Sequence, residues 1–480
     1  MIKQRFLWFP QKASIQHLLS TVGKAILLMG VLLVSAGWFS YASADTTPFA
    51  GAAGDITTYM GSNIRINYNS FETILNKGNI SQLKLHWQYH SGGTIDTQPI
   101  VSNGVIYWGS WDGYEHATNL NGQQLWQTFL GKDTPPGRCS PASAGVAGTS
   151  TVASVAINGK NTRVVFVPGG NDRFYALNAS NGAVIWATAL GTPPDEMIWA
   201  GSALYKGSIY VGISSYGDCP LRPGRVYRLS STTGAIQNTF HTTPNNCNGA
   251  GVWDAPAVDV ASDTIFVSTG TRTLCGQYES LAYAVLQLRA SDLTLVRSWQ
   301  VPLAQQAYDS DFGDSPTLFT ARIGGTIHPM LGILNKNGHY YAFDRSNIGA
   351  GPVWERQLAG PISNIAASAW DGTKLYVATA VSNITGKRCA GSVSALNPAT
   401  GQSVWEYCTP GKVIAAPTVI PGLVIISASN QMVILDTATG QPKFIFKAPG
   451  FGATFFGSAT VSHGVLYIGN ANGTLYAFGL

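Results

Sequence analysis

The sequence predicts an all-β protein, and three observations lead to an eight-bladed β-propeller. The 480 residues include 54 Gly and 11% aromatic side chains but only 11% charged ones, a composition typical of short strands joined by tight turns. A hairpin motif recurs along the chain. A half-copy of that motif ends the chain, and a strand of matching type stands alone near the start. Two such halves can close a ring of blades.

The repeated unit has the form Ala-Leu-Asn-x3-Gly-x3-Trp. Clear copies cover 175–186, 394–405 and 433–444, and weaker copies end at Trp126, Asn238, Trp299 and Trp354. Asn or Asp before a Gly-containing turn, between alternating apolar runs, predicts a β-hairpin because Gly accepts positive φ. Seven full copies and the final half-copy over 464–478 predict eight four-stranded blades.

The lone strand is Leu83-Lys-Leu-His-Trp-Gln-Tyr89, which has no blade before it. Pairing it with the C-terminal half-copy hides both open edges, so we expect this pair to close the ring. The copies stand about 40 to 60 residues apart, and the usual propeller repeat is ~40–50 residues. The excess predicts long loops that carry the ligand-binding surface, at 132–150, 216–224, 243–250, 271–281 and 302–315.

The N-terminal segment reads as a secretory signal. Residues 1–24 are basic and free of acids, 25–39 are apolar, and Ala42-Ser43-Ala44 offers small residues for cleavage. The apolar run is shorter than the ~20 residues of a membrane-spanning helix, although an uncleaved anchor is the alternative. We therefore predict a signal peptide over 1–44 and one propeller domain over 45–480. The mature chain is then exported to the periplasm, cell envelope or medium and is not an integral membrane protein.

Charge argues against nucleic acid as a partner. The chain carries a net charge of +5, but Lys3, Arg5, Lys12 and Lys24 lie in the acid-free first segment. The remaining body is nearly neutral, so it has no basic field to follow a phosphate backbone.

All six cysteines lie beyond the signal, so an oxidising compartment can pair them. Cys389 and Cys408 flank the turn over 397–401 almost symmetrically, and strands returning from that turn would bring them within bridging distance. We predict this disulfide, with two buried thiols as the alternative, and the other four cysteines stay unassigned. Metal ligation by cysteine is disfavoured, because the sequence has no Cys-x-x-Cys and its eight His show no ligand-like spacing.

The repeat resembles the tryptophan-docking repeat of the quinoprotein dehydrogenases, eight-bladed propellers that bind pyrroloquinoline quinone. The segment from Asn67 to Trp87 is similar to the entry segment of that family, and 251–258 with 309–316 most resemble its polyvinyl-alcohol dehydrogenase group. The resemblance implies an oxidoreductase acting on the CH–OH group of a small or polymeric alcohol, with a quinone cofactor and Ca²⁺. No Cys-x-x-Cys-His occurs, so electrons would leave through a separate acceptor such as a cytochrome c.

Three positions match site motifs of that family. Lys336, in a Lys-Asn-Gly strand, is similar to the Lys that contacts the quinone, where an ammonium stabilises developing negative charge. Trp253 resembles the indole on which the planar cofactor stacks. Asp311 lies where the family places its catalytic base, and Asp309 and Asp314 are neighbours able to share that role. The structural alternatives are a surface Lys, a core Trp and an acidic loop.

Other positions depart from the family. Its calcium ligands are a Glu and an Asn beside the quinone. Here Thr271 stands at the Asn position, and Asp218 is the nearest acid to the Glu position. A vicinal Cys-Cys is absent and Cys139 lies in that region, where Arg138 could bind a quinone carboxylate through its planar fork.

Two other classes compete with the dehydrogenase. The missing Asn ligand favours a non-catalytic envelope propeller that binds proteins or polysaccharide, although the chain lacks the lipid-anchor cysteine of such scaffolds. Hydrolysis has little support, because there is no Gly-x-Ser-x-Gly motif.

Overall fold

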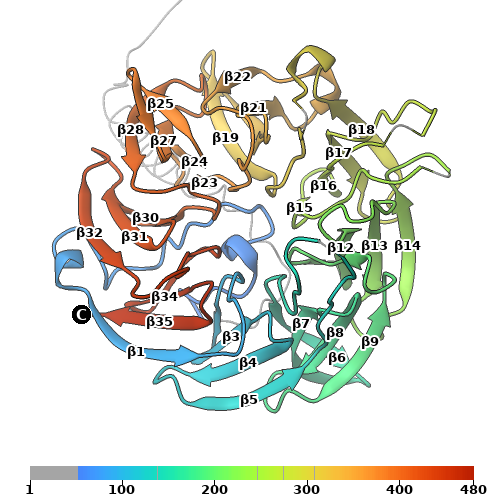
Figure 1. Ribbon diagram of the computed structural model, residues 1–480, viewed down its shortest axis with the longest axis horizontal. Helices are drawn as coiled ribbons and strands as arrows, with labels where there is room; N and C mark the ends of the chain where they lie inside the picture. Colours follow the sequence, from blue (N-terminus) through green and yellow to red (C-terminus); the bar gives the residue numbers. More distant parts are fainter. Residues whose placement is uncertain (1–51, 138, 246, 274, 308) are drawn as a thin grey trace, which may run out of the picture. The chain divides into compact units, whose positions relative to one another are not determined.

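The computed structural model describes residues 52–480 except 138, 246, 274 and 308. In the described part of the chain, antiparallel sheets form eight blades arranged as a propeller (Figure 1). The predicted fold is therefore confirmed. The predicted signal peptide and Arg138 lie outside the described residues, so the division at residue 44 stays a prediction.

Blades are numbered here from the N-terminus, and each runs from its inner strand to its outer strand. The first four consist of these strands: blade 1, β2 (Ile100–Ser102), β3 (Val105–Gly109), β4 (Tyr114–Asn119) and β5 (Gln124–Phe129); blade 2, β6 (Thr151–Ile157), β7 (Lys160–Pro168), β8 (Arg173–Asn178) and β9 (Val184–Ala189); blade 3, β11 (Ala203–Tyr205), β12 (Ser208–Ser215), β13 (Arg225–Ser230) and β14 (Ile236–His241), with β10 (Glu196–Met197) on the end of β12; blade 4, β15 (Ala257–Asp259), β16 (Thr264–Ser268), β17 (Ala284–Arg289) and β18 (Leu295–Gln300).

The other four follow the same order: blade 5, β19 (Thr317–Ile323), β20 (Thr326–Leu334), β21 (His339–Asp344) and β22 (Trp354–Gln357); blade 6, β23 (Ala369–Trp370), β24 (Leu375–Thr379), β27 (Gly391–Leu396) and β28 (Ser403–Thr409), with the hairpin β25 (Ser382–Ile384) and β26 (Lys387–Cys389); blade 7, β29 (Thr418–Ile420), β30 (Leu423–Ala428), β31 (Gln431–Asp436) and β32 (Pro442–Lys447); blade 8, β33 (Thr460–Ser462), β34 (Val465–Gly469), β35 (Thr474–Gly479) and β1 (Lys84–His90). Single 3-10 turns are η1 (Tyr59–Gly61), η2 (Ile80–Gln82), η3 (Leu303–Gln305) and η4 (Ile348–Ala350).

Blade 8 closes the ring as the sequence predicts. Strand β1 pairs antiparallel with β35, placing Trp87 opposite Ala477 and Tyr89 opposite Leu475. Figure 1 shows the two strands side by side although they come from opposite ends of the chain. The edge of the C-terminal sheet is thereby covered.

The repeated Gly and Trp form a joint between neighbouring blades. Trp126 of blade 1 donates its indole N–H to the Ala179 carbonyl of blade 2 at 3.0 Å. Gly182, at φ 71°, lies beneath that indole, and a Cβ there would come within 2.6 Å of it. The Trp87 indole meets the carbonyl of Leu120 in the same way. Where the motif is complete, one large ring packs on the next blade and a residue without a side chain receives it.

Replacing Trp126 by Ala should lower the free energy of unfolding by about 3–5 kcal/mol, because a buried indole and its hydrogen bond are lost. Urea unfolding followed by circular dichroism measures this. Leu125→Ala on the same strand is the control, since Leu125 is half exposed, and it should cost less than about 1 kcal/mol. Equal losses in both variants would contradict the joint.

The five long loops all connect strands at one end of the blades, because each joins either the second to the third strand or an outer strand to the next blade. Disulfides Cys139–Cys219 and Cys247–Cys275 link four of them in pairs. The predicted Cys389–Cys408 bridge is present and pins the β25–β26 hairpin to β28. The helices of the described residues are too short to cross a membrane.

Candidate functional site

Two adjoining cavities lie among the long loops. The smaller has a volume of about 330 Å³ and the larger about 540 Å³, and both are lined by Ser140, Pro141, Trp199 and Trp253. The smaller cavity also contains Asp218, Thr271, Asp311 and Lys336. Four of the five predicted loops therefore contribute to its wall, and the fifth supports it, since Ala250 N–H donates to the Thr271 carbonyl at 2.5 Å.

Lys336 is the central cation of the smaller cavity. It stands at the turn between β20 and β21, where its backbone N–H donates to the Asp311 carbonyl at 3.0 Å. Its ammonium donates to both oxygens of Asp309, at 2.9 and 3.0 Å, and to Asp311 Oδ2 at 3.1 Å. Two carboxylates therefore hold one ammonium at the cavity wall.

Trp253 lies next to this ion cluster. The Lys336 ammonium lies 4.9 Å from the centre of the indole, within cation–π range. Two glycines permit the approach: a Cβ at Gly313 would overlap the indole ring, and one at Gly270 would lie 3.2 Å from its nitrogen and 3.1 Å from the Asp311 carboxylate. The indole, the ammonium and the carboxylate therefore meet in one place because the neighbouring backbone carries no side chains.

The charges of the cluster are shifted by burial. Burial raises the pKa of Asp311 to about 6, an effect that the Lys336 charge opposes and the Asp309 charge reinforces. Burial also raises the pKa of Asp218. For Lys336, burial acts to lower the pKa, but the nearby Asp311 and Asp309 outweigh it and raise the pKa. Asp311 is thus an acid–base group that titrates near neutral pH beside a permanent cation.

Thr271 bridges two carboxylates with one hydroxyl. Its Oγ1 lies 2.8 Å from Asp311 Oδ1 and 3.2 Å from Asp218 Oδ2. A hydroxyl has one proton and donates to only one acceptor fully. At the other contact, the lone pairs of the hydroxyl oxygen and of the carboxylate oxygen face each other unless a proton or a cation lies between the two atoms. The oxygens of Thr271, Asp311 and Asp218 are ligands of the type that Ca²⁺ prefers.

The structure therefore brings together six of the seven residues proposed from sequence: Asp218, Trp253, Thr271, Asp309, Asp311 and Lys336. Arg138 is outside the described residues. Asp314 is buried and accepts the N–H of Leu334 at 2.8 Å, in the strand beneath the cavity wall. Thr271 and Asp218, which depart from the family pattern, lie 3.2 Å apart, measured from Oγ1 to Oδ2.

Sequence reasoning missed the residues of the larger cavity, which include Tyr59, Asp96, Trp111, Trp199 and Asp254. Burial raises the pKa values of Asp96 and Asp254 to about 8, so both are neutral acids at pH 7. These residues belong to no repeated motif. Only their convergence in space identifies them.

The cavities fit a flat cofactor with polar edges. Their volumes lie in the range of small-molecule sites, ~300–1,000 Å³. The indole of Trp253 offers a stacking face, and Lys336 offers a charge beside it. Trp111 and Asp96 line the larger cavity together, and a hydrogen bond from the Trp111 indole acts to lower the pKa of Asp96 against the effect of burial. Lys336, Trp253 and Trp111 would hold a quinone here.

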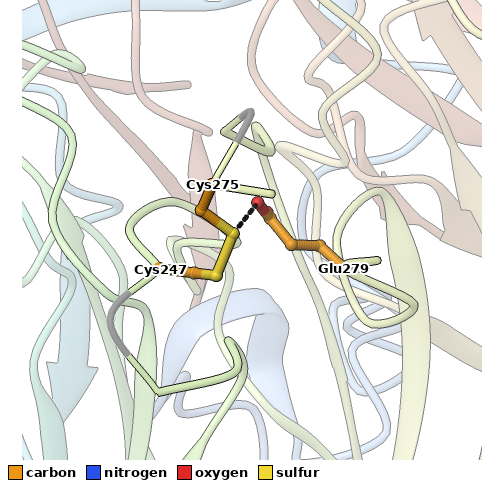
Figure 2. A group of neighbouring side chains, drawn as sticks. All are labelled: Cys247, Cys275 and Glu279. Atoms are coloured by element: carbon orange, nitrogen blue, oxygen red, sulfur yellow. Dashed lines mark hydrogen bonds between the residues drawn. A yellow bond between two sulfur atoms is a disulfide. The ribbon is translucent and has the colours of Figure 1, made fainter. Parts of the chain in front are cut away.

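A third cluster has the spacing of a metal site but a different chemistry. Sulfurs of Cys247 and Cys275 lie near a carboxylate oxygen of Glu279 (Figure 2). The two sulfurs are joined in a disulfide, so neither is a thiolate able to bind metal. Glu279 instead accepts the backbone N–H of Thr273 at 3.1 Å. The disulfide fastens the loop over 243–250 to the loop over 271–281, which begins at Thr271.

Comparison with known proteins gives one family and several relatives. A family model described as outer membrane protein assembly factor BamB matches residues 79–204 and 334–480, together more than half of the chain. Polyvinylalcohol dehydrogenase of Sphingopyxis sp. (strain 113P3) is 25% identical over 76% of this chain and 63% of its own length. A polyvinylalcohol dehydrogenase of Pseudomonas sp. is 22% identical over 82% of this chain and 70% of its own length. The chain thus spans about two thirds of these relatives.

Among solved structures, quinohemoprotein alcohol dehydrogenase ADHIIG of Pseudomonas putida HK5 superposes with a TM-score of 0.74. It covers 89% of this chain and 80% of its own, at 15% identity, which supports the fold. The resemblance inferred from the tryptophan-docking repeat is confirmed by these relatives. The chain therefore belongs to the propeller family described as outer membrane protein assembly factor BamB, with relatives named as quinoprotein-type alcohol dehydrogenases.

Proposed function

We propose that this chain is an exported quinone-dependent alcohol dehydrogenase. The observation that carries the proposal is the meeting of Trp253, Lys336 and Asp311 at one cavity, since these residues come from different blades and were chosen from sequence motifs alone. The relatives named polyvinylalcohol dehydrogenase support the same reaction class. The substrate is then a primary or secondary alcohol, small or polymeric.

Each residue has a separate task. Asp311 takes the hydroxyl proton of the alcohol, for which its raised pKa suits it. Lys336 holds negative charge on the cofactor edge, and Trp253 supports the ring from one face. Asp218 and Thr271 supply oxygens for a Ca²⁺ ion next to Asp311. When bound, pyrroloquinoline quinone supplies the hydride acceptor, and a separate carrier such as a cytochrome c removes the electrons.

Reconstitution tests the proposal. The purified chain is mixed with pyrroloquinoline quinone and Ca²⁺, quinone binding is measured by equilibrium titration, and reduction of an artificial dye is followed with a panel of alcohols. We expect quinone binding, and dye reduction that depends on both the alcohol and the quinone. Absence of binding and of turnover across the panel would contradict the proposal.

The second candidate is a non-catalytic envelope scaffold, favoured by the family model that the chain matches. Against the scaffold stands the buried carboxylate of Asp311, which lies with Lys336 at the indole, because burying a charge costs free energy and a scaffold does not need this arrangement. Protein isolated from its native host separates the two. A coloured bound quinone supports the enzyme, whereas tight association with envelope proteins without a chromophore supports the scaffold.

The acid limb of activity should depend on Asp311. As pH falls through the pKa of Asp311, its base form is lost, so kcat/KM should decline about tenfold per pH unit. The bend is expected at or below about pH 6, because a bound cation acts in the same direction as Lys336 and lowers the pKa. Asp309→Asn removes a negative charge that raises this pKa, so the bend should move to lower pH. A bend that moves up, or stays in place, contradicts this assignment.

A further inference from the structure

A second group of charged residues lies among the loops of blades 1 to 3, and its charges are unbalanced. Burial raises the pKa of Asp172, and the charges of Asp133, Glu196 and Asp195 raise it further, whereas that of Arg225 lowers it. Both arginines are already engaged: Arg225 bonds Glu196 at 2.6 Å, and Arg222 bonds Asp195. Among the described residues, no Lys or Arg forms an ion pair with the two remaining acids, Asp133 and Asp172.

Asp172 is fully buried, and neither of its carboxylate oxygens has a hydrogen-bond partner within the described part of the chain. Asp133 is 5% exposed, and its Oδ2 also lacks a partner there. The hydroxyl of buried Tyr216, whose pKa is raised by burial and by the Asp133 charge, is a fourth such oxygen. Buried polar groups are normally satisfied, and an unpaired buried carboxylate costs several kcal/mol. Several oxygens therefore share the need for one positive partner.

Asp172 occupies a turn position that is a glycine in several other blades. In three other blades, the residue whose carbonyl accepts the N–H that follows the outer strand is a glycine at positive φ: Gly113, Gly338 and Gly473. Asp172 makes the same bond, to the N–H of Leu190 at 2.9 Å, but at φ 57° with a side chain. Blade 4 has Tyr283 at φ 51° in this position, and blade 7 has Asn430, so side chains are accepted there. Blade 2 differs from these blades in that the side chain is a carboxylate.

The surrounding backbone packs tightly around the two acids. A Cβ at Gly191 would lie 3.0 Å from the Asp172 side chain, and a Cβ at Gly131 would lie 2.5 Å from Asn171. Asp133 follows Gly131 by two residues and is held by paired backbone bonds to Ala144 at 2.8 and 3.1 Å. The segment 131–133 therefore lies against the turn that carries Asp172, and the charge of Asp133 acts on the buried Asp172 carboxyl.

We propose that Asp133 and Asp172 bind one hard divalent cation of the Ca²⁺ or Mg²⁺ class. Its two positive charges balance the two carboxylates, and carboxylate oxygens with water are the ligands that such ions prefer. The hydroxyl of Tyr216 completes the set by donating to Asp133 or to a water on the ion. This site is separate from the Asp218–Thr271 oxygens of the cavity, and it does not depend on the proposed oxidation of alcohols.

The ion would brace the wall of the cavity. Asp133 lies in the loop that also carries Ser140 and Pro141, and both of these residues line the smaller cavity. Tyr216 directly precedes Gly217 and Asp218, which line it as well. An ion that joins Asp133 to the blade 2 turn would fix the loop over 132–150. The Cys139–Cys219 disulfide links this loop to the loop over 216–224. The cation is thus a structural element behind the site rather than a participant in its chemistry.

The test compares cation binding by chain variants after chelation. The purified full chain is freed of metal with EDTA, dialysed against Ca²⁺ or Mg²⁺ in separate arms, and analysed for bound metal and for Tm. Asp172→Gly removes the carboxylate and introduces the residue found at the equivalent turns of blades 1, 5 and 8, so this variant should fold. It should bind one equivalent less of the preferred cation than the parent and lose the cation-dependent rise in Tm. Asp133→Asn should behave likewise.

Asp218→Asn is the matched control, because it alters the cavity but leaves Asp133 and Asp172 intact. It should keep the equivalent that Asp172→Gly loses. Equal cation binding by the parent and Asp172→Gly would overturn the proposal, as would loss of all binding in Asp218→Asn. A parent Tm that is the same in EDTA, Ca²⁺ and Mg²⁺ would also overturn it and would mean that the two carboxyls share a proton instead.

Discussion

Asp311→Asn should reduce kcat for alcohol oxidation by about 10²–10⁴-fold while quinone binding is retained. The amide has the size of the carboxyl but cannot accept a proton. Its oxygen still receives the hydrogen bond that Thr271 donates at 2.8 Å, whereas the bond from Lys336 to Oδ2 is lost and Lys336 keeps Asp309. Steady-state dye reduction with quinone at saturation measures the loss, and fluorescence titration with the quinone shows that the site is intact.

Two further variants separate a base from a merely structural acid. Asp309→Asn touches the same ammonium but should keep most of kcat, since Asp309 is more exposed than Asp311, at 35% against 7%. Asp311→Glu should restore part of the activity with an altered pH profile. If Asp311→Asn retains kcat and Asp309→Asn abolishes it, the base is Asp309 and the assignment is wrong.

Lys336→Met should lower kcat by about 10²–10³-fold, the usual effect of removing one group that stabilises developing negative charge. It should also weaken quinone binding, because the cation is lost and the carboxylates of Asp309 and Asp311 then repel each other and any anionic ligand. Quinone titration and dye reduction on the same samples separate the two effects.

Lys336→Arg is the control for that substitution, since it keeps the charge and changes only the geometry. It should retain quinone binding better than Lys336→Met. Thermal unfolding of both variants without quinone checks that the fold survives. If Lys336→Met binds and turns over as the parent does, Lys336 is a structural partner of Asp309 and contributes nothing to the cofactor site.

Much of the fold was predictable because it repeats. The hairpin motif, the lone strand ending at Tyr89 and the half-copy at the C-terminus are local patterns, and eight blades follow from counting them. The Cys389–Cys408 bridge was predictable for the same reason, since one hairpin sets the distance between its two strands. The bridges Cys139–Cys219 and Cys247–Cys275 join separate loops, whose contacts no local pattern encodes.

The site was predictable only in part. Trp253, Asp311 and Lys336 were accessible because each lies in a motif resembling a known one. The contact of Thr271 with both Asp218 and Asp311 could not be foreseen, because it depends on loops 53 and 40 residues apart. The larger cavity, with Asp96 and Trp111, was missed for the same reason.

The sequence by itself determined the ring: periodic apolar strands, a glycine beneath each docking tryptophan, and a complementary pair of end strands are local properties of the chain. Only the tertiary structure decided which charges face one another. The ammonium of Lys336 lies between Asp309 and Asp311 because a long loop and the short turn between β20 and β21 pack together at one end of the blades. Electrostatic free energy depends on distance and burial, and neither is encoded in the order of residues along one loop.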